Sequence, residues 1–131
     1  MKAKDEMIAI LRHLALDRQA VTLMCEDISS IEEDIKKELP AMQREALEAE
    51  RSHLMSCMEV TQHHNDRIER LLSLLSSEEQ VVLENMIINP YPNVIFDLAE
   101  KLGYETCSIY RIRARALDKL TRLRYGAGAN A

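Results

Sequence analysis

The stretch TCSIYRIRARAL, residues Thr106 to Leu117, decides how this chain is interpreted. Its apolar residues Ile109, Ile112 and Ala116 recur three and four positions apart, so one face of a helix can be buried. Arginines occupy positions between them and would face outward. The stretch therefore predicts an amphipathic helix with a cationic exposed face.

Two shorter helices are predicted before this one, and their ends are marked. Ser76 with Glu79 forms a capping box, Asn93 suits the N-cap of the second helix, and Gly103 suits its C-terminal turn. Each helix has one apolar stripe: Val82, Leu83, Met86 and Ile87 in the first, Ile95, Leu98, Ala99 and Leu102 in the second, and Ile109, Ile112, Ala116 and Leu120 in the third. The pattern predicts a trihelical helix-turn-helix, with double-stranded DNA as the expected partner.

In a helix-turn-helix the first turns of the last helix reach base edges, while its flanks and its end contact phosphates. We expect Arg111 to be the strongest base contact, because its planar fork can bond both O6 and N7 of a guanine. Arg113 lies nearer the buried edge, so an internal ion pair with an acid such as Asp97 or Glu100 is an equal alternative to a phosphate contact. The expected base contacts are Thr106, Cys107, Tyr110 and Arg111, and the expected phosphate contacts are Arg113, Arg115, Lys119, Arg122 and Arg124.

The net charge of −5 conceals an uneven distribution. Residues 1–75 hold ten Lys or Arg and fifteen Asp or Glu, whereas residues 104–125 hold six Arg or Lys and two acids, giving +4. Positive potential is thus concentrated on the last helix, where phosphates would lie. We expect weak nonspecific affinity that falls sharply with salt.

Residues 1–75 show two long helical patterns. Apolar residues follow a spacing of three and four from Met7 to Leu39 and again from Leu47 to Leu75, and Pro40 should break the chain between them. The favoured arrangement is an antiparallel coiled-coil hairpin with helices of roughly 50 Å, and a single bent helix in a parallel dimer is the alternative. The first apolar stripe is wide, which predicts a homodimer or packing on the C-terminal unit. Five polar seam positions either specify the register of the coiled coil or lie on an exposed side, and the exposed side is the favoured interpretation: Arg18, Glu32, Arg51, Thr61 and Asn65.

The composition supports an all-α fold, since the chain has one Phe, no Trp and three Gly and no alternating β pattern. The predicted organisation is a helical hairpin at 1–75 for oligomerisation or partner binding, a helix-turn-helix domain at 76–126 and a disordered tail at 127–131. No apolar run is long enough for a membrane helix, and the first residues do not resemble a signal peptide, so a cytoplasmic protein is expected. Three scattered cysteines without a CxxC predict free thiols.

Several segments together resemble region four of bacterial sigma factors: LSSEEQVVL from Leu75, DLAEKLGY from Asp97, IYR from Ile109 and RALDKL from Arg115. In that family the region is a helix-turn-helix that reads the −35 promoter element and docks on RNA polymerase. A charged helical hairpin followed by a lone region-four unit is similar to phage-encoded transcriptional regulators of the ArpU and RinA type, found in phages and prophages of Gram-positive bacteria and associated with late genes. The resemblance implies a promoter-binding regulator that acts with RNA polymerase.

This chain departs from the family at two points. Glu105 stands where a Ser or Thr N-cap is usual, so either Thr106 caps the helix instead or the helix begins less firmly. The connection from Asn89 to Asn93 contains two prolines and is stiffer than the usual turn. No segment resembles the sigma region that melts the −10 element.

Motifs for catalysis, such as a P-loop, GxSxG or HExxH, do not occur, so an enzyme is not expected and no cofactor is implied. His53, Cys57 and His64, with Cys25 from the facing helix, form a conceivable metal cluster, but we expect ordinary surface side chains and no metal site. Cys107 is expected to be a small contact residue rather than a redox sensor.

Two other functions remain open. Small terminase subunits, which package DNA, also join a helix-turn-helix to a helical oligomerisation segment. An interaction module that binds polymerase or a sigma factor through the acidic hairpin, without contacting DNA, is the third possibility.

Overall fold

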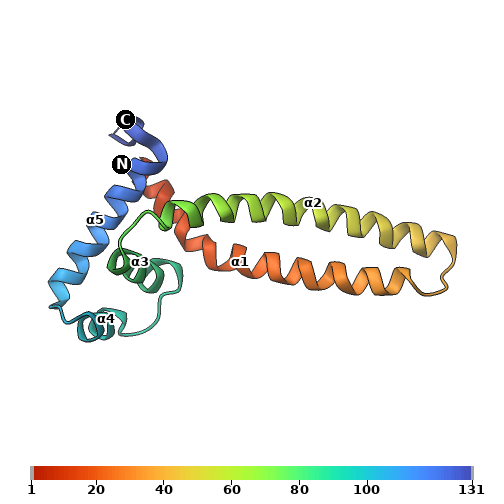
Figure 1. Ribbon diagram of the computed structural model, residues 1–131, viewed down its shortest axis with the longest axis horizontal. Helices are drawn as coiled ribbons and strands as arrows, with labels where there is room; N and C mark the ends of the chain where they lie inside the picture. Colours follow the sequence, from red (N-terminus) through yellow and green to blue (C-terminus); the bar gives the residue numbers. More distant parts are fainter. Residues whose placement is uncertain (1, 131) are drawn as a thin grey trace. The chain divides into compact units, whose positions relative to one another are not determined.

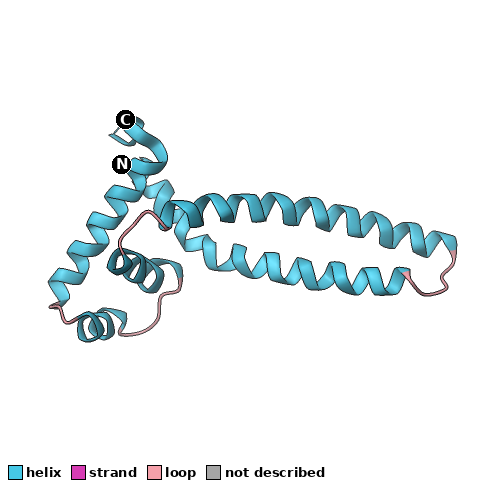
Figure 2. Ribbon diagram, viewed as in Figure 1, coloured by secondary structure: helices cyan, strands magenta, loops and turns pink. Residues whose placement is uncertain are grey.

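The computed structural model describes residues 2–130, and within this range every regular element is a helix (Figures 1 and 2). The all-α prediction is confirmed. The predicted disordered tail overlaps a 3-10 turn at Gly126–Asn130, and residue 131 lies outside the described residues. The helices are α1 (Lys2–Ile35), α2 (Ala41–Leu72), α3 (Ser77–Leu83), α4 (Val94–Leu102) and α5 (Thr106–Tyr125), and a π-helical turn at Glu84–Ile88 continues α3.

The chain divides into two compact units. Unit 1 comprises residues 2–15 and 67–130, and unit 2 comprises Leu16–Asp66. The limits of these two units lie inside α1 and α2. The boundary predicted at residue 75 rests on the charge and periodicity of the sequence and stays a prediction.

In unit 2, residues 16–35 of α1 and 41–66 of α2 run side by side in opposite directions (Figure 1). The break predicted at Pro40 is confirmed, since α1 ends at Ile35 and α2 begins at Ala41. The Arg44 guanidinium closes the turn by donating to the carbonyl oxygens of Ile35 at 2.6 Å and Lys37 at 3.0 Å. The first bond satisfies a carbonyl at the end of α1 that has no partner within the helix, and the second satisfies a carbonyl of the turn itself.

The polar seam positions of unit 2 do not all face solvent. Glu32 is exposed as expected, whereas Arg18, Arg51 and Thr61 are half-buried. Asn65 is only 4% exposed, so the expectation that it lies on an exposed side is wrong. Its Oδ1 has no hydrogen-bond partner among the described residues, which leaves an amide oxygen unsatisfied at a buried position.

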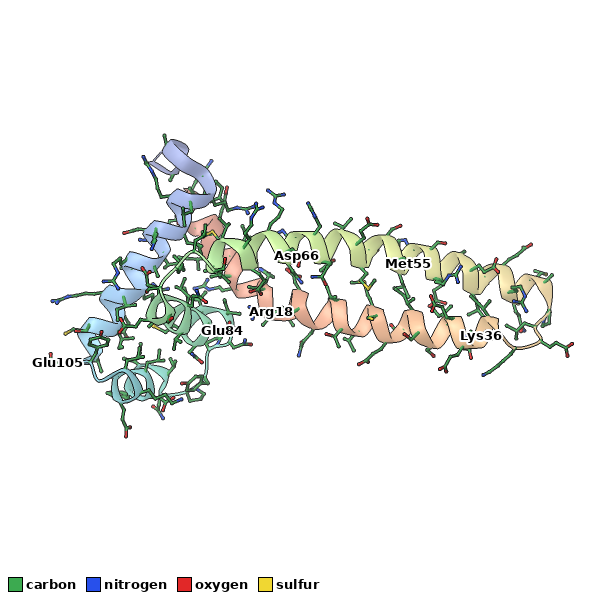
Figure 3. The ribbon with its side chains drawn as sticks, viewed as in Figure 1. Arg18, Lys36, Met55, Asp66, Glu84 and Glu105 are labelled. Carbon is green, nitrogen blue, oxygen red and sulfur yellow. The ribbon has the colours of Figure 1, made fainter. Side chains whose placement is uncertain are left out.

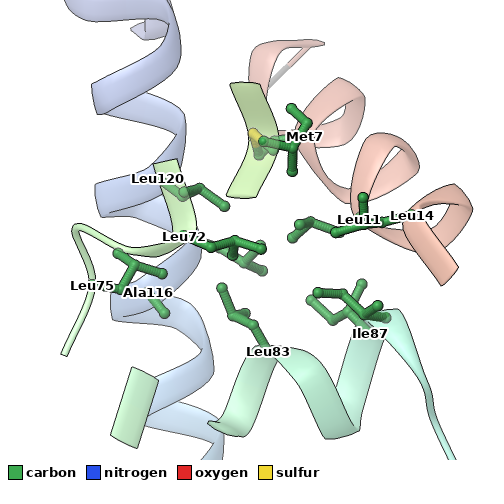
Figure 4. Close-up of a cluster of buried hydrophobic side chains, with 12 residues drawn as sticks. Met7, Leu11, Leu14, Leu72, Leu75, Leu83, Ile87, Ala116 and Leu120 are labelled. Atoms are coloured by element: carbon green, nitrogen blue, oxygen red, sulfur yellow. The ribbon is translucent and has the colours of Figure 1, made fainter. Parts of the chain in front are cut away.

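The main core of unit 1 joins residues from both ends of the chain (Figure 4). Met7, Leu11 and Leu14 at the start of α1 are fully buried in the same cluster as side chains from the end of α2, from α3 and from α5. Fully burying each such side chain contributes about 1.5–3 kcal/mol. The cluster therefore holds the second half of α5 in place. Its other buried members are Ile68, Leu72, Leu75, Leu83, Ile87, Ile88, Ala116, Leu117 and Leu120.

A second, smaller cluster lies beneath the first half of α5. Val82, Leu98, Ile109 and Ile112 are buried together, one or two from each of α3, α4 and α5. Ile95 and Leu102 of α4 pack against them. The predicted apolar stripes therefore meet here only in part. Their remaining buried members belong to the main core, namely Leu83, Ile87, Ala116 and Leu120.

The connection between α3 and α4 is shaped by backbone geometry. The Asn89 amide donates to the Glu84 carbonyl at 2.8 Å, which is the five-residue bond of a π turn, and Pro90 cannot continue the helix because it has no N–H. Asn93 occupies the N-cap position as expected, but it adopts a left-handed conformation with φ 61° and its side chain makes no capping bond. The predicted N-cap position is therefore confirmed, but α4 begins without a side-chain capping bond.

Candidate nucleic-acid interface

The predicted capping box at the start of α3 is formed. The Ser76 hydroxyl accepts from the Glu79 amide at 3.2 Å, and the Glu79 carboxylate accepts from the Ser76 amide at 2.9 Å. This pair satisfies two of the donors that a helix start leaves free. Among the described residues Glu79 is the one charged residue that is buried, with a side chain only 4% exposed.

Two cations of α5 share the Glu79 carboxylate. Arg115 Nε lies 3.4 Å from Oε2, and Lys119 Nζ lies 3.6 Å from Oε1. Burial raises the pKa of this carboxyl, but the Ser76 hydrogen bonds and the charges of Lys119 and Arg115 outweigh burial, so the net pKa is lowered. Both cations were predicted as phosphate contacts, and they remain 62% and 48% exposed while touching Glu79.

The turn from α4 into α5 is held at two points. Gly103 adopts φ 73°, a left-handed conformation in which a side chain would be strained, and the Tyr104 amide donates to the Ala99 carbonyl at 3.0 Å. The Tyr104 hydroxyl donates to the Glu78 carboxylate at 2.6 Å, and this hydrogen bond raises the pKa of Tyr104. The start of α5 is therefore tied to the start of α3. Nothing in the sequence pattern marked Tyr104 for this role.

Helix α5 begins without a side-chain cap. Glu105, labelled in Figure 3, is the N-cap residue, but only its carbonyl oxygen accepts, from the Ser108 amide at 3.0 Å and the Ile109 amide at 3.3 Å. Thr106 is the first helical residue and does not replace the cap. The Cys107 thiol lies 3.7 Å from a Glu105 carboxylate oxygen. Of the two sequence alternatives, the structure agrees with the less firmly capped start.

The exposed face of α5 presents the predicted base contacts at its beginning. Cys107, Tyr110 and Arg111 are exposed, and Tyr110 retains 55% of its accessible surface. Thr106 is half-buried. At one hundred degrees per residue, Cys107 and Arg111 lie opposite the buried Ile109, with Tyr110 on the flank.

A cationic stripe follows along the same helix. Arg111, Arg115, Lys119 and Arg122 are all exposed, and their spacing of four, four and three places them on one face over about 16 Å. Asp118 lies beside this stripe, and the Lys4 ammonium at 2.9 Å offsets its charge. The face of α5 that points away from the core therefore carries positive charge along its length.

The remaining two predicted phosphate contacts lie elsewhere. Arg113 is half-buried, and no ion pair involving it is found among the described residues. Asp97, one of its suggested partners, instead accepts from the Tyr91 hydroxyl and pairs with Lys101 at 3.0 Å; these bonds lower the pKa of Asp97. Arg124 is half-buried, and its guanidinium lies 5.5 Å from the centre of the Tyr125 ring.

A shallow hollow lies between the beginnings of α4 and α5. It is lined by Asn93, Val94, Ile95, Phe96, Thr106 and Tyr110. Phe96 is 69% exposed although it is one of the largest apolar side chains in the chain. The periodicity of α4 did not identify Phe96 as a functional candidate, because it lies off the buried stripe.

The histidines and cysteines considered above as a metal cluster include one close pair. The Cys57 sulfur lies 3.8 Å from His53 Nε2, and the three cysteines are free thiols. Across residues 2–130, no group of three or more His, Cys, Asp or Glu side chains is placed to hold a metal ion.

None of the described helices combines the length and apolarity that crossing a membrane requires.

Searches of protein-family models, curated proteins and solved structures found no match to this chain.

Proposed function

We propose that this protein is a sequence-specific DNA-binding transcriptional regulator that inserts the start of α5 into the major groove of a promoter. The observation that carries the proposal is the exposed stripe of Arg111, Arg115, Lys119 and Arg122, continuous with exposed Tyr110. A helix that is cationic on its free face, with side chains at its first turns available to base edges, has the features of a recognition helix. The arrangement of α3, α4 and α5 is proposed to be a helix-turn-helix of sigma region-four type.

The narrower proposal is regulation of phage or prophage late genes together with RNA polymerase. It rests on the resemblance of the segments between residues 75 and 120 to region four of sigma factors. The burial of Leu98, Ile109 and Ile112 in one cluster is compatible with that resemblance, because a helix-turn-helix requires α4 and α5 to pack against each other.

The charge and the exposed apolar residues of unit 2 favour binding to a protein over binding to DNA. It holds five Lys or Arg and twelve Asp or Glu, a net charge of −7 that would repel DNA. Leu16, Leu23 and Val60 are 63%, 58% and 72% exposed, so apolar contact area is available within this acidic segment. We assign self-association to a homodimer, or contact with polymerase, to this unit.

DNA binding is tested by fluorescence anisotropy with a duplex that the protein selects from a random-sequence library. Arg111→Ala should weaken specific binding by about tenfold or more and relax the preference at one base pair, because a bidentate contact to guanine discriminates by about 1–3 kcal/mol. Arg122→Ala should weaken all sequences alike and reduce the salt slope by about one. Lys36→Ala, which removes one exposed charge in the loop of unit 2 (Figure 3), is the matched control.

Equal binding by the wild type and the Arg111→Ala variant, with the preference unchanged, would refute direct base contact. Mass in solution then separates the alternatives, since a monomer or dimer agrees with a regulator whereas a large ring would indicate a packaging protein. Retention of polymerase binding by an Arg111→Ala, Arg115→Ala double variant that no longer binds DNA would separate the two partner surfaces.

A further inference from the structure

The hollow between α4 and α5 is lined by two aromatic side chains that do not belong to the buried core. Phe96 and Tyr110 project from the beginnings of the two helices and keep 69% and 55% of their surface exposed, while Asn93, Val94, Ile95 and Thr106 complete the lining. The buried cluster beneath is built from Val82, Leu98, Ile109 and Ile112 and does not include either ring. Two aromatic rings around an open apolar hollow are therefore available to a ligand.

The charges around the hollow favour a DNA duplex as the occupant. Arg111 follows Tyr110 directly on α5 and is exposed, and it begins the cationic stripe. The acid of the first turn of α4, Asp97, is engaged by Tyr91 and Lys101. Glu105 is the remaining acid at this end of α5; its side chain lies beside Cys107 and could accept from a cytosine amino group in the major groove.

We propose that this hollow receives the C5-methyl group of a thymine, so that Phe96 and Tyr110 recognise thymine by apolar contact. Of the groups displayed on major-groove edges, the thymine methyl is the apolar one, and an apolar side chain at the start of a recognition helix is suited to it. The inference rests on the proposed DNA-binding function and adds to it the base that is recognised and the residues that recognise it.

The probe is the duplex selected by the wild-type protein from a random library, compared with copies in which each thymine in turn is replaced by deoxyuridine. This replacement removes one methyl group and leaves the hydrogen-bonding edge unchanged. Affinity should fall about fourfold at one or two positions, the effect of exposing one buried methyl group. Replacement at the other thymines should have no effect.

The Phe96→Ser variant should bind the thymine and deoxyuridine duplexes equally, with an affinity near that of the wild type for the deoxyuridine duplex. Because Phe96 is largely exposed, the substitution should leave the fold intact, and the helical circular dichroism should be unchanged. Val60→Ser, which alters an exposed apolar residue of unit 2, is the matched control and should keep the fourfold discrimination.

Tight binding with every deoxyuridine tolerated, or a selected duplex without a preferred thymine, would overturn the methyl-recognition proposal and leave DNA binding standing. A discrimination that persists in Phe96→Ser and also in Tyr110→Ala would place the methyl contact elsewhere and overturn it as well. Failure to bind any duplex at low salt would overturn both proposals.

Discussion

Replacing Glu79 by Gln should make the protein less stable and at the same time increase its affinity for DNA. A glutamine oxygen can still accept from the Ser76 amide, so the capping box keeps its shape. The negative charge that Arg115 and Lys119 now share is lost. The variant therefore separates the capping role of Glu79 from its electrostatic role.

The expected loss of stability is about 0.5–1 kcal/mol. Each lost ion pair contributes a few tenths of a kcal/mol, because the Arg115 and Lys119 side chains are 62% and 48% exposed and solvent screens them. The pKa of Glu79 is lowered in the folded state, so its contribution is present above the ordinary value of 4.5 and is lost as pH falls through the folded pKa. The difference between wild type and variant should thus disappear in acid.

The expected gain in DNA affinity is about threefold or more. A phosphate bonded to either cation would lie about 7 Å from the Glu79 carboxylate, and at that separation two negative charges repel by about 0.6 kcal/mol even in bulk water. Removing the carboxylate also frees Arg115 and Lys119 to neutralise phosphates more completely. The salt slope should become steeper by up to about one.

The assay combines urea denaturation with anisotropy measured over a range of salt concentrations. Ser76→Ala breaks the cap without changing charge, so it should lower stability by about 1 kcal/mol and leave affinity for DNA unchanged. Glu59→Gln, an exposed acid in unit 2, controls for the change in net charge. A Glu79→Gln variant that bound DNA no more tightly than the Glu59→Gln variant would refute the sharing of these cations between Glu79 and phosphate.

Three further predictions test the fold. Arg44→Ala should speed hydrogen exchange around residues 33–48, with a local loss of about 1–2 kcal/mol, because two carbonyl oxygens lose their donor; unchanged exchange would contradict the turn geometry. Leu117→Ala should cost about 2–4 kcal/mol in urea denaturation, since Leu117 is fully buried, whereas Leu123→Ala at 44% exposure should stay within about 0.5 kcal/mol. Asn65→Leu should raise the melting temperature by removing a buried amide oxygen that has no hydrogen-bond partner among the described residues, and a lower melting temperature would show that Asn65 has a partner in solution.

Features set by local chemistry were predictable from the sequence. The Ser76 and Glu79 cap, the left-handed Gly103 and the break at Pro40 each depend on a few neighbouring residues with a strong backbone preference. The exposed position of Tyr110 and Arg111 followed from the periodicity of α5, because the buried residues fix the opposite face.

Features that depend on distant contacts were not predictable. The wide apolar stripe of the first helix predicted either a homodimer or packing on the C-terminal unit, and the sequence alone could not show which residues would meet. In the structure Met7 and Leu11 are buried with Leu117, more than a hundred residues away, although the same spacing of three and four would suit a coiled-coil seam equally well. Asn65 lies on a seam that the sequence could assign to either side of α2. Its burial is set by what packs against the helix and not by its own preference.

The same limit applies to the charge of the candidate interface. Periodicity places Arg111, Arg115, Lys119 and Arg122 on one face of α5 and makes them equivalent, but the structure makes them unequal: Glu79, thirty-six residues before Arg115, touches the middle two. Arg111 and Arg122, at the two ends of the stripe, have no ion pair among the described residues. Binding should therefore depend more strongly on the two ends than on the middle, a pattern that the sequence of α5 alone does not contain.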